Sequence, residues 1–161
     1  MEALQDAGLV RGIGVSNHRV EDMQAILAVA KHKPLVNQVE LHPQLPQPEL
    51  VNFCEDHGIV VVAYNPLAPA TRFADGAAAK AAADVASAHP GFDAPSVLLS
   101  WAVSRGFAVV TTSKTPGRAA AAVKAADGLR LTSAEVEAIS RAGAREAPRR
   151  AFWKNEFGEA V

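Results

Sequence analysis

The stretch GIVVVAYNPL, residues 58–67, decides the fold class. It opens with a glycine, continues with six apolar or aromatic residues at 59–64 and ends in a polar turn that contains a proline. A helical pattern at residues 48–57 leads into it, so Gly58 stands where the end of a helix favours glycine. A strand without polar alternation is typical of a parallel sheet that helices cover on both faces. The sequence therefore predicts an α/β fold in which this strand is buried on both sides.

The same order of helix, glycine and apolar strand recurs at residues 93–111. Asp93 is expected to cap a helix, Gly106 to end it, and residues 107–111 to form the next strand. Two earlier strands are expected at residues 12–16 and 36–40. The helix between them carries apolar residues at helical spacing, namely Val20, Met23, Ile26, Leu27 and Ala30.

Two more helices begin with recognisable signals. Thr115 and Pro116 form an N-cap and first-turn pair, and the run TSAE at residues 132–135 is a capping box. We therefore count four βα units plus a C-terminal helix and tail, all in one domain. Four parallel strands cannot close a barrel, which usually needs about 200 residues or more, and an open four-strand sheet is the alternative. The helical pattern at residues 2–8 looks like a closing turn without a beginning, which favours a fragment of a larger barrel.

Composition indicates an ordinary globular protein. The 161 residues include 16 Lys and Arg against 17 Asp and Glu, so there is no electrostatic reason to expect nucleic acid or an anionic membrane as partner. We see no secretory signal and no apolar run long enough to span a bilayer. The single cysteine, Cys54, lies on an apolar helix face and suits a reducing, cytoplasmic location. The alanine-rich pattern at residues 77–88 is expected to form a solvent-facing helix.

Four blocks of sequence together resemble the aldo-keto reductase family. They are GLVRGIGVSN at 8–17, KPLVNQVELHP at 33–43, GIVVVAYNPL at 58–67 and TSKTPGR at 112–118, and they occur in the family's order. Each block lies at the C-terminal end of an expected strand, where barrel enzymes build their sites. The resemblance implies the C-terminal half of a (β/α)8 TIM barrel, with residues 1–161 forming a partial domain whose N-terminal half is missing.

By the same resemblance, these blocks bind NADP (NADPH). Ser16, Asn17 and Gln38 would hold the nicotinamide carboxamide, which has one acceptor and two donors that amide side chains can answer. Tyr64 would stack on the nicotinamide ring. The remaining implied contacts are Asn65 and Leu67 along the pyrophosphate, and Ser113, Lys114 and Arg118 around the adenosine 2′-phosphate.

No catalytic residue carries over from the family. The family reduces carbonyls with a tyrosine acid supported by lysine, aspartate and histidine, and the resemblance places all four in the half of the barrel that is absent here. The chain has one tyrosine, Tyr64, which already belongs to the stacking block. We therefore expect an NADPH-dependent reductase of small carbonyl substrates whose isolated chain is inactive. The alternatives are a non-catalytic dinucleotide- or partner-binding half-barrel and an inactive gene fragment, and self-association through open barrel edges is possible.

Several of these residues also have purely structural interpretations. Asn17 could satisfy backbone groups at a strand-to-helix turn. Glu40 and His42 share a strand face, but no third ligand has suitable spacing for a metal, and we favour a structural role beside Pro43. In the tail, Phe152 and Trp153 would either touch substrate or anchor the tail.

Overall fold

A computed structural model of the chain describes residues 1–157. Its sheet has four parallel strands in the order β1-β2-β3-β4, so that sequence neighbours are also neighbours in the sheet. In the first pair, Gly14 lies opposite Val36 and Ser16 opposite Gln38. The strands are β1 (Gly14–Ser16), β2 (Val36–Glu40), β3 (Val60–Tyr64) and β4 (Ala108–Val110). The expected α/β fold with parallel strands is confirmed, although three strands are shorter than predicted because regular pairing begins and ends inside the apolar runs.

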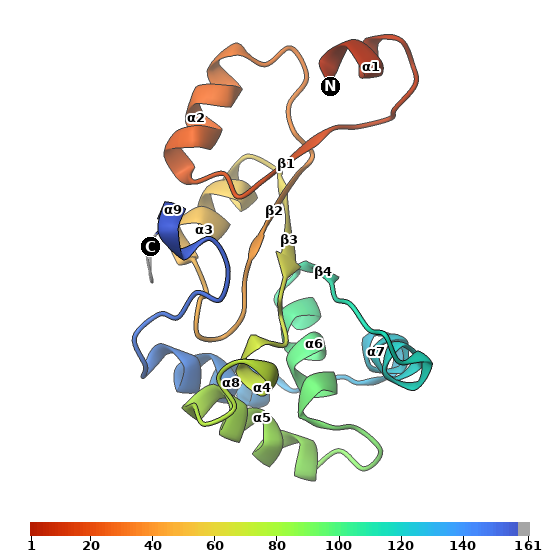
Figure 1. Ribbon diagram of the computed structural model, residues 1–161, viewed down its shortest axis with the longest axis vertical. Helices are drawn as coiled ribbons and strands as arrows, with labels where there is room; N and C mark the ends of the chain where they lie inside the picture. The colour runs from red at the N-terminus through yellow and green to blue at the C-terminus, as the bar shows by residue number, and fades with distance from the viewer. Residues whose placement is uncertain (158–161) are drawn as a thin grey trace. The chain divides into compact units, whose positions relative to one another are not determined.

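Helices alternate with the strands and continue after the last one (Figure 1). They are α1 (Glu2–Asp6), α2 (Val20–Val29), α3 (Pro48–Asp56), α4 (Ala68–Thr71), α5 (Ala77–Ser87), α6 (Ala94–Ser104), α7 (Pro116–Gly128), α8 (Ser133–Ala144) and α9 (Lys154–Phe157).

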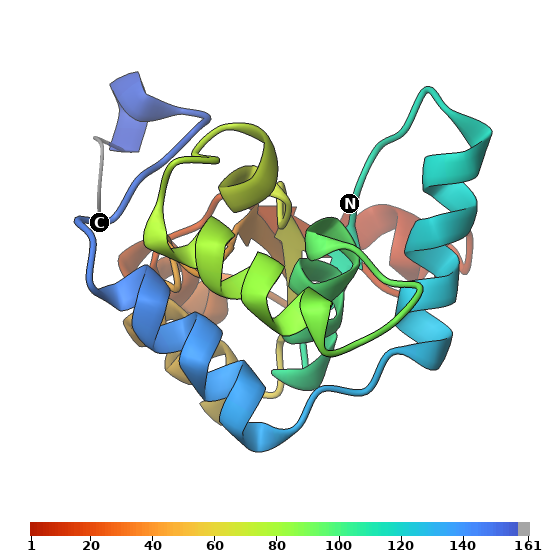
Figure 2. The ribbon, with the colours of Figure 1, turned by 90° about the horizontal axis from the view of Figure 1, so that it is seen from below.

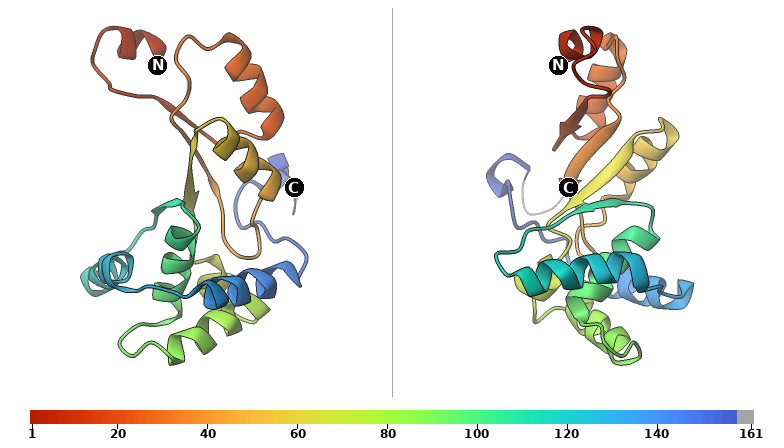
Figure 3. Two further views of the ribbon diagram at one scale, coloured as in Figure 1. Left: turned by 180° about the vertical axis from the view of Figure 1, so that it is seen from behind. Right: turned by 90° about the vertical axis from the view of Figure 1, so that its right-hand side faces the viewer.

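The chain forms two compact units. Unit 1 consists of Met1–Val39 and Gln47–Val62, and unit 2 of Glu40–Pro46 and Ala63–Val161. In unit 1, helices α2 and α3 are in contact. Figure 3 shows both helices in two further views. Met23 on α2 and Cys54 on α3 are fully buried there, which confirms the apolar face predicted for Cys54.

In unit 2, helices α5, α6 and α8 pack on one another, and α6 also contacts α7 and β4. Figure 2 shows α5 and α8 running side by side. The core of this unit is built around Trp101 on α6, which is 1% exposed and whose indole N–H donates to the Ser140 hydroxyl on α8 at 2.9 Å. A buried indole N–H needs such an acceptor, and this one joins two helices of the unit.

The strands differ from the sequence prediction in their burial. In β3, Val61 and Ala63 are buried, whereas Val60 is 47% exposed. The residues of β1 and β4 alternate between exposed and half-buried. The prediction that β3 is buried on both faces is therefore wrong for residues 1–157. Side chains on a strand point alternately to opposite faces, and here only one face is covered by described residues.

Helix α5 also departs from the prediction. It was expected to face solvent, yet Ala78, Ala79 and Ala82 are buried where α5 meets α6 and α8. Lys80 is exposed, so the helix is amphipathic with alanine as its apolar residue. Alanine side chains are small enough to let neighbouring helices approach closely, and a count of polar residues does not reveal this.

The predicted helix ends are confirmed by their hydrogen bonds. The Asp93 carboxylate accepts from the Ser96 N–H at 2.9 Å, and the Thr132–Glu135 capping box is complete. Gly58 and Gly106 adopt φ values of +62° and +83° after their helices. Thr115 is the N-cap of α7 as predicted, but its side chain makes no capping bond; the Ser113 hydroxyl accepts from the Thr115 N–H instead.

Candidate functional site

The first group of predicted cofactor residues lies at the C-terminal end of β1 and at the position opposite it in β2, within unit 1. The Gln38 carbonyl accepts two bonds there, from the Asn17 N–H at 2.9 Å and from the Ser16 hydroxyl at 2.8 Å. Ser16, Asn17 and Gln38 are thus brought together. Asn17 has φ +58°, a left-handed conformation that asparagine tolerates better than most residues and that ends the strand abruptly.

The side chains of Asn17 and Gln38 make no hydrogen bond to any residue in 1–157. Both residues are half-buried. The structural alternative for Asn17, a side chain that satisfies the turn's own backbone, therefore does not describe this structure. Two amide groups with unused donors and acceptors remain at one strand edge.

The turn is held instead by Asn37, a residue that the sequence analysis missed. Asn37 is fully buried, its side-chain amide donates to the His18 carbonyl at 2.8 Å, and its side-chain oxygen accepts from the His18 N–H at 3.4 Å. The amide of Asn37 therefore fixes the backbone next to Asn17. An amide side chain inside a strand of a helix-covered sheet was the available signal, because a buried amide needs hydrogen-bond partners.

The second group lies at the end of β3, within unit 2. Tyr64, Asn65 and Leu67 are all half-buried, and Asn65 has φ +54°, so β3 ends at a left-handed asparagine just as β1 does. The Asn65 carbonyl accepts from the Ala68 N–H at 3.1 Å and so begins α4. Its side-chain amide donates to Glu40 Oε1 at 2.8 Å. Asn65 is therefore held in place by a carboxylate at the end of the neighbouring strand.

Glu40 is the most heavily bonded side chain of this region. It is 0% exposed, and besides Asn65 it accepts from the backbone N–H groups of Ala151 and Phe152. Burial alone would raise the pKa of the Glu40 carboxyl, but the bonds from His42, Asn65 and the tail backbone outweigh burial and lower the pKa overall. Glu40 is therefore a buried carboxylate that stays ionised.

His42 lies next to this carboxylate and is also fully buried. Its Nε2 is 3.5 Å from Glu40 Oε1, a long and therefore weak hydrogen bond. Burial lowers the pKa of His42, Glu40 opposes this shift, and the charge of Arg150 adds to it. We therefore treat His42 as neutral near pH 7. Within residues 1–157, no group of three or more metal-ligating side chains is present.

The third group lies at the start of α7, also within unit 2. The Ser113 hydroxyl bonds the backbone of Thr115, at 2.9 Å to its carbonyl and 3.0 Å to its N–H, and shapes the turn before the helix. Lys114 and Arg118 are exposed and make no ion pair in the part of the chain that the structure describes. β3 and β4 are neighbouring parallel strands, and their C-terminal ends lie at the same edge of the sheet. Tyr64 is the last residue of β3, and Ser113 comes three residues after β4.

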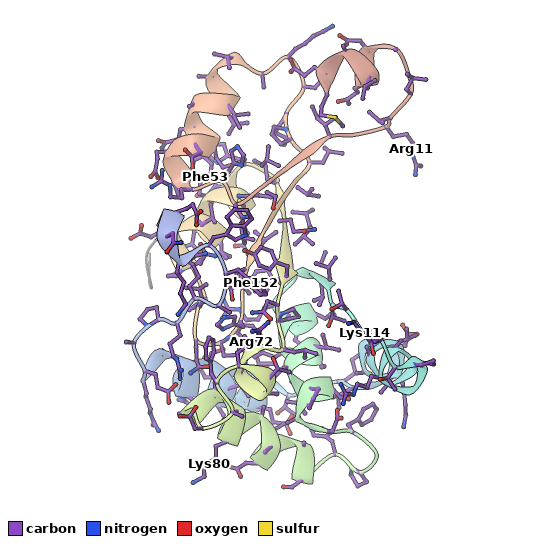
Figure 4. All side chains as sticks on the ribbon, in the orientation of Figure 1. Arg11, Phe53, Arg72, Lys80, Lys114 and Phe152 are labelled. Atoms are coloured by element: carbon purple, nitrogen blue, oxygen red, sulfur yellow. The ribbon has the colours of Figure 1, made fainter. Side chains whose placement is uncertain are left out.

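The structure bears on one of the two interpretations of the tail, anchoring by its aromatic rings, while contact with substrate stays a prediction. Phe152 is 41% exposed and Trp153 is 53% exposed, so neither ring is buried as an anchor. The Phe152 ring stands edge-on to Tyr64, with ring centroids 6.2 Å apart, and the Arg72 guanidinium lies 5.4 Å from the Phe152 centroid. Figure 4 shows Arg72 and Phe152 close together. The tail is attached through its backbone, and its aromatic side chains remain accessible.

Comparison with known proteins identifies the family of this chain. The sequence pattern of the Aldo/keto reductase family matches residues 1–144. The chain therefore belongs to the aldo-keto reductase family, whose members are oxidoreductases with a TIM-barrel fold. The resemblance inferred from the four sequence blocks is thus confirmed at the level of the family.

Relatives of known activity align with nearly all of this chain. The glycerol 2-dehydrogenase (NADP(+)) of Hypocrea jecorina is 37% identical over 168 residues, covering 100% of this chain and 51% of the relative. The NADPH-dependent alpha-keto amide reductase of Saccharomyces cerevisiae is 36% identical over 173 residues, covering 99% of this chain and 52% of the relative. The chain spans about half the length of the curated relatives that it matches.

The chain also covers about half the length of the solved structures that it matches. Aldose reductase from Giardia lamblia superimposes with a TM-score of 0.81 at 35% identity, covering 96% of this chain and 53% of that one. An aldo-keto reductase enzyme from a Medee basin deep-sea metagenome library reaches a TM-score of 0.84 at 28% identity, with 94% and 53% covered. The four-strand parallel sheet therefore corresponds to about half of an aldo-keto reductase barrel. None of the helices in residues 1–157 has the length and hydropathy of a transmembrane segment.

Proposed function

We propose that this chain is the C-terminal, cofactor-binding half of an NADPH-dependent aldo-keto reductase that converts aldehydes or ketones to alcohols. The proposal is supported by family membership, by the half-length match to relatives named for NADP(+) or NADPH, and by polar residues at the C-terminal ends of the strands. Residues 1–161 would form a partial domain, completed by an N-terminal half. A cytoplasmic location is part of this proposal, since Cys54 is buried and unpaired.

Three residues of unit 1 fit the carboxamide end of such a cofactor. The amides of Asn17 and Gln38 have unused donors and acceptors, and the bonds to the Gln38 carbonyl fix Ser16 and Asn17 against β2. A carboxamide needs both kinds of partner, and amide side chains provide both. These residues would orient the nicotinamide ring.

In unit 2, Tyr64 provides a half-buried aromatic ring that can pack against the nicotinamide, and Leu67 with the backbone of Asn65 would border the pyrophosphate. At α7, Ser113, Lys114 and Arg118 surround a helix N-terminus. Arg118 carries a permanent planar charge suited to phosphate oxygens. The preference for a 2′-phosphate rests on a single observation: Lys114 and Arg118 are exposed beside a helix N-terminus and form no ion pair with any residue in 1–157.

Orientation, not proton transfer, is the contribution of these residues. When bound, the dihydronicotinamide supplies a hydride to the carbonyl carbon. The carbonyl oxygen must then gain a proton, and a positioned acid typically contributes about 10²–10⁴-fold to the rate. Tyr64 is the one tyrosine and is assigned to stacking. The proposal therefore places the acid in the complementary half.

The 2′-phosphate assignment can be tested on the chain itself with two nucleotides. Adenosine 2′,5′-bisphosphate should bind more tightly than adenosine 5′-monophosphate, and Arg118→Ala should remove most of that difference. Loss of one charge-assisted contact is worth about 1.5–3 kcal/mol, or roughly ten- to a hundredfold in the dissociation constant. Titration calorimetry or chemical-shift titration measures both constants.

Arg141→Ala is the matched control, because Arg141 is also an exposed helical arginine of unit 2 and lies on α8. This variant should bind both nucleotides as the unchanged chain does. Equal weakening of the two nucleotides in Arg118→Ala would contradict the assignment.

A further inference from the structure

Glu40 receives hydrogen bonds from two segments that are distant in sequence. Asn65, 25 residues later, donates its side-chain amide to Oε1 at 2.8 Å. Ala151, 111 residues later, donates its N–H at 3.0 Å to Oε1 and 3.2 Å to Oε2, and the Phe152 N–H donates to Oε2 at 3.0 Å. One carboxylate thus joins the end of β3 to the tail within unit 2.

The burial of Glu40 makes this arrangement energetically demanding. A carboxylate at 0% exposure has lost its hydration, and only well-placed donors can compensate for that loss. Two of its donors are backbone N–H groups of the tail, which an ionised carboxylate bonds more strongly than a neutral acceptor would. If the tail moved away, the carboxylate would be left without these donors. Docking of the tail is therefore strongly favoured while Glu40 is ionised.

Other contacts of the tail lie on either side of this anchor. On the N-terminal side, the Arg149 N–H donates to the Gln44 carbonyl at 3.0 Å, and its guanidinium lies 4.2 Å from the Phe73 ring centroid. On the C-terminal side, the Phe152 ring meets the Tyr64 ring at an interplanar angle of 68°. The Phe152 ring is too exposed for apolar burial to hold it, so its position depends on the backbone bonds at Ala151 and Phe152 and on the Arg72 guanidinium, 5.4 Å from its centroid.

We propose that Glu40 is a positioning residue for Tyr64: by anchoring the backbone of Ala151 and Phe152, its carboxylate holds the Phe152 ring edge-on to Tyr64 and thereby sets how a planar ligand reaches the Tyr64 ring. The identity of that ligand as a nicotinamide rests on the function proposed above. The anchoring itself does not, because every contact in it lies within the chain.

The chain offers an unusually direct readout, since Tyr64 is its one tyrosine. Biosynthetic incorporation of 3-fluorotyrosine gives a fluorine signal in the NMR spectrum that reports the surroundings of the Tyr64 ring, including the neighbouring Phe152 ring. Phe152→Ala defines the chemical shift of Tyr64 without the neighbouring ring. We expect Glu40→Gln to move the Tyr64 signal to that same position, because the glutamine NH₂ cannot accept a bond from the tail and meets another donor there.

Two further variants separate anchoring from general loss of structure. Ala151→Pro removes one tail N–H and leaves Glu40 and the Phe152 ring intact, so it should shift the Tyr64 signal in the same direction even if Glu40→Gln folds poorly. The double variant with Glu40→Gln and Phe152→Ala should show no shift beyond that of either single change. Glu135→Gln is the control: it disturbs the capping box of α8 and should leave the Tyr64 signal unchanged.

A Tyr64 signal that stays at its original position in both Glu40→Gln and Ala151→Pro, while Phe152→Ala shifts it, would overturn the proposal. So would an unshifted signal in Phe152→Ala, since the two rings would then not meet. No nucleotide is present in this experiment. Failure of the proposed cofactor function, seen as absent nucleotide binding, would therefore leave its outcome unaffected.

Discussion

At the scale of single residues, two polar side chains of β2 organise the strand ends. Asn37 holds the backbone of His18 in unit 1, and Glu40 holds Asn65 and the tail in unit 2. Both are fully buried, whereas the third polar residue of β2, Gln38, is half-buried. Each forms bonds to a neighbouring segment that ends or turns there. Buried polar groups of this kind cost stability unless all their bonds form, so they specify one arrangement of the segments that they join.

The buried pair Glu40 and His42 should make the chain sensitive to acid. The pKa of His42 lies below its ordinary value of 6.5 when folded, so the unfolded chain takes up this proton first, and stability falls as the pH drops below 6.5. The pKa of Glu40 lies below its ordinary value of 4.5, so its contribution is present above pH 4.5 and is lost as the pH falls further. One linked proton gives a slope of at most about 1.4 kcal/mol per pH unit. Urea unfolding at a series of pH values measures this slope.

Replacing His42 identifies the source of the first decline. His42→Leu should flatten the dependence between pH 6.5 and 5, whatever its effect on stability at pH 8. His89→Gln, at a partly exposed histidine that bonds Glu135, is a comparison from the same unit. An unchanged slope in His42→Leu would show that another group is responsible.

At the scale of elements, α8 packs against the loop after β2 at one point of very close approach. A Cβ atom built on Gly143 would lie 2.0 Å from the Pro43 carbonyl oxygen and 2.9 Å from the Pro43 Cβ. Backbone atoms cannot move aside as a flexible side chain can. Glycine at 143 therefore permits the contact, and the buried side of α8 depends on it.

Gly143→Ala should destabilise the chain although alanine is the better helix former. The gain in helix propensity is about 1 kcal/mol, whereas overpacking against fixed backbone typically costs about 1–3 kcal/mol. Thermal or urea unfolding measures the balance. Gly117→Ala on α7 is the matched control, because no atom lies within 4 Å of its new Cβ, and its stability should be unchanged or higher. A Gly143→Ala chain as stable as Gly117→Ala would contradict the close packing.

At the scale of the whole molecule, the sheet order leaves β1 and β4 with one neighbouring strand each. Both have exposed positions, and Val110 on β4 is 40% exposed. Strands in this position present unpaired backbone groups that favour association with another chain. Under the proposed function that partner would be the complementary half of the barrel, and self-association of the isolated chain is the competing outcome.

The isolated 161-residue chain should not turn over carbonyl substrates. Under the proposed function it holds the cofactor but lacks the proton donor and the opposing strands of the barrel. The measurement is NADPH oxidation with a panel of aldehydes, using the chain alone and after mixing with the N-terminal half of an aldo-keto reductase. Sedimentation of the same samples gives their state of association. Turnover by the isolated monomer would mean that the catalytic acid lies within this chain.

Local features of the fold were predictable from the sequence. The caps at Asp93 and Thr132 and the left-handed glycines at 58 and 106 depend on residues a few positions apart. Four motifs in family order were also sufficient to indicate the aldo-keto reductase family. These features are determined by backbone geometry and short-range hydrogen bonds, which a linear pattern records directly.

Tertiary structure decided which residues meet across long separations. Glu40 and Phe152 are 112 positions apart, and Gln44 and Glu146, whose side chains bond within unit 2, are 102 positions apart. Nothing in the sequence around Glu40 indicates that its partner is a tail backbone, because backbone N–H groups are identical at every non-proline residue. The buried alanine face of α5 and the contact at Gly143 depend likewise on which neighbour approaches and how closely. Such contacts depend on three-dimensional packing, and no local pattern encodes them.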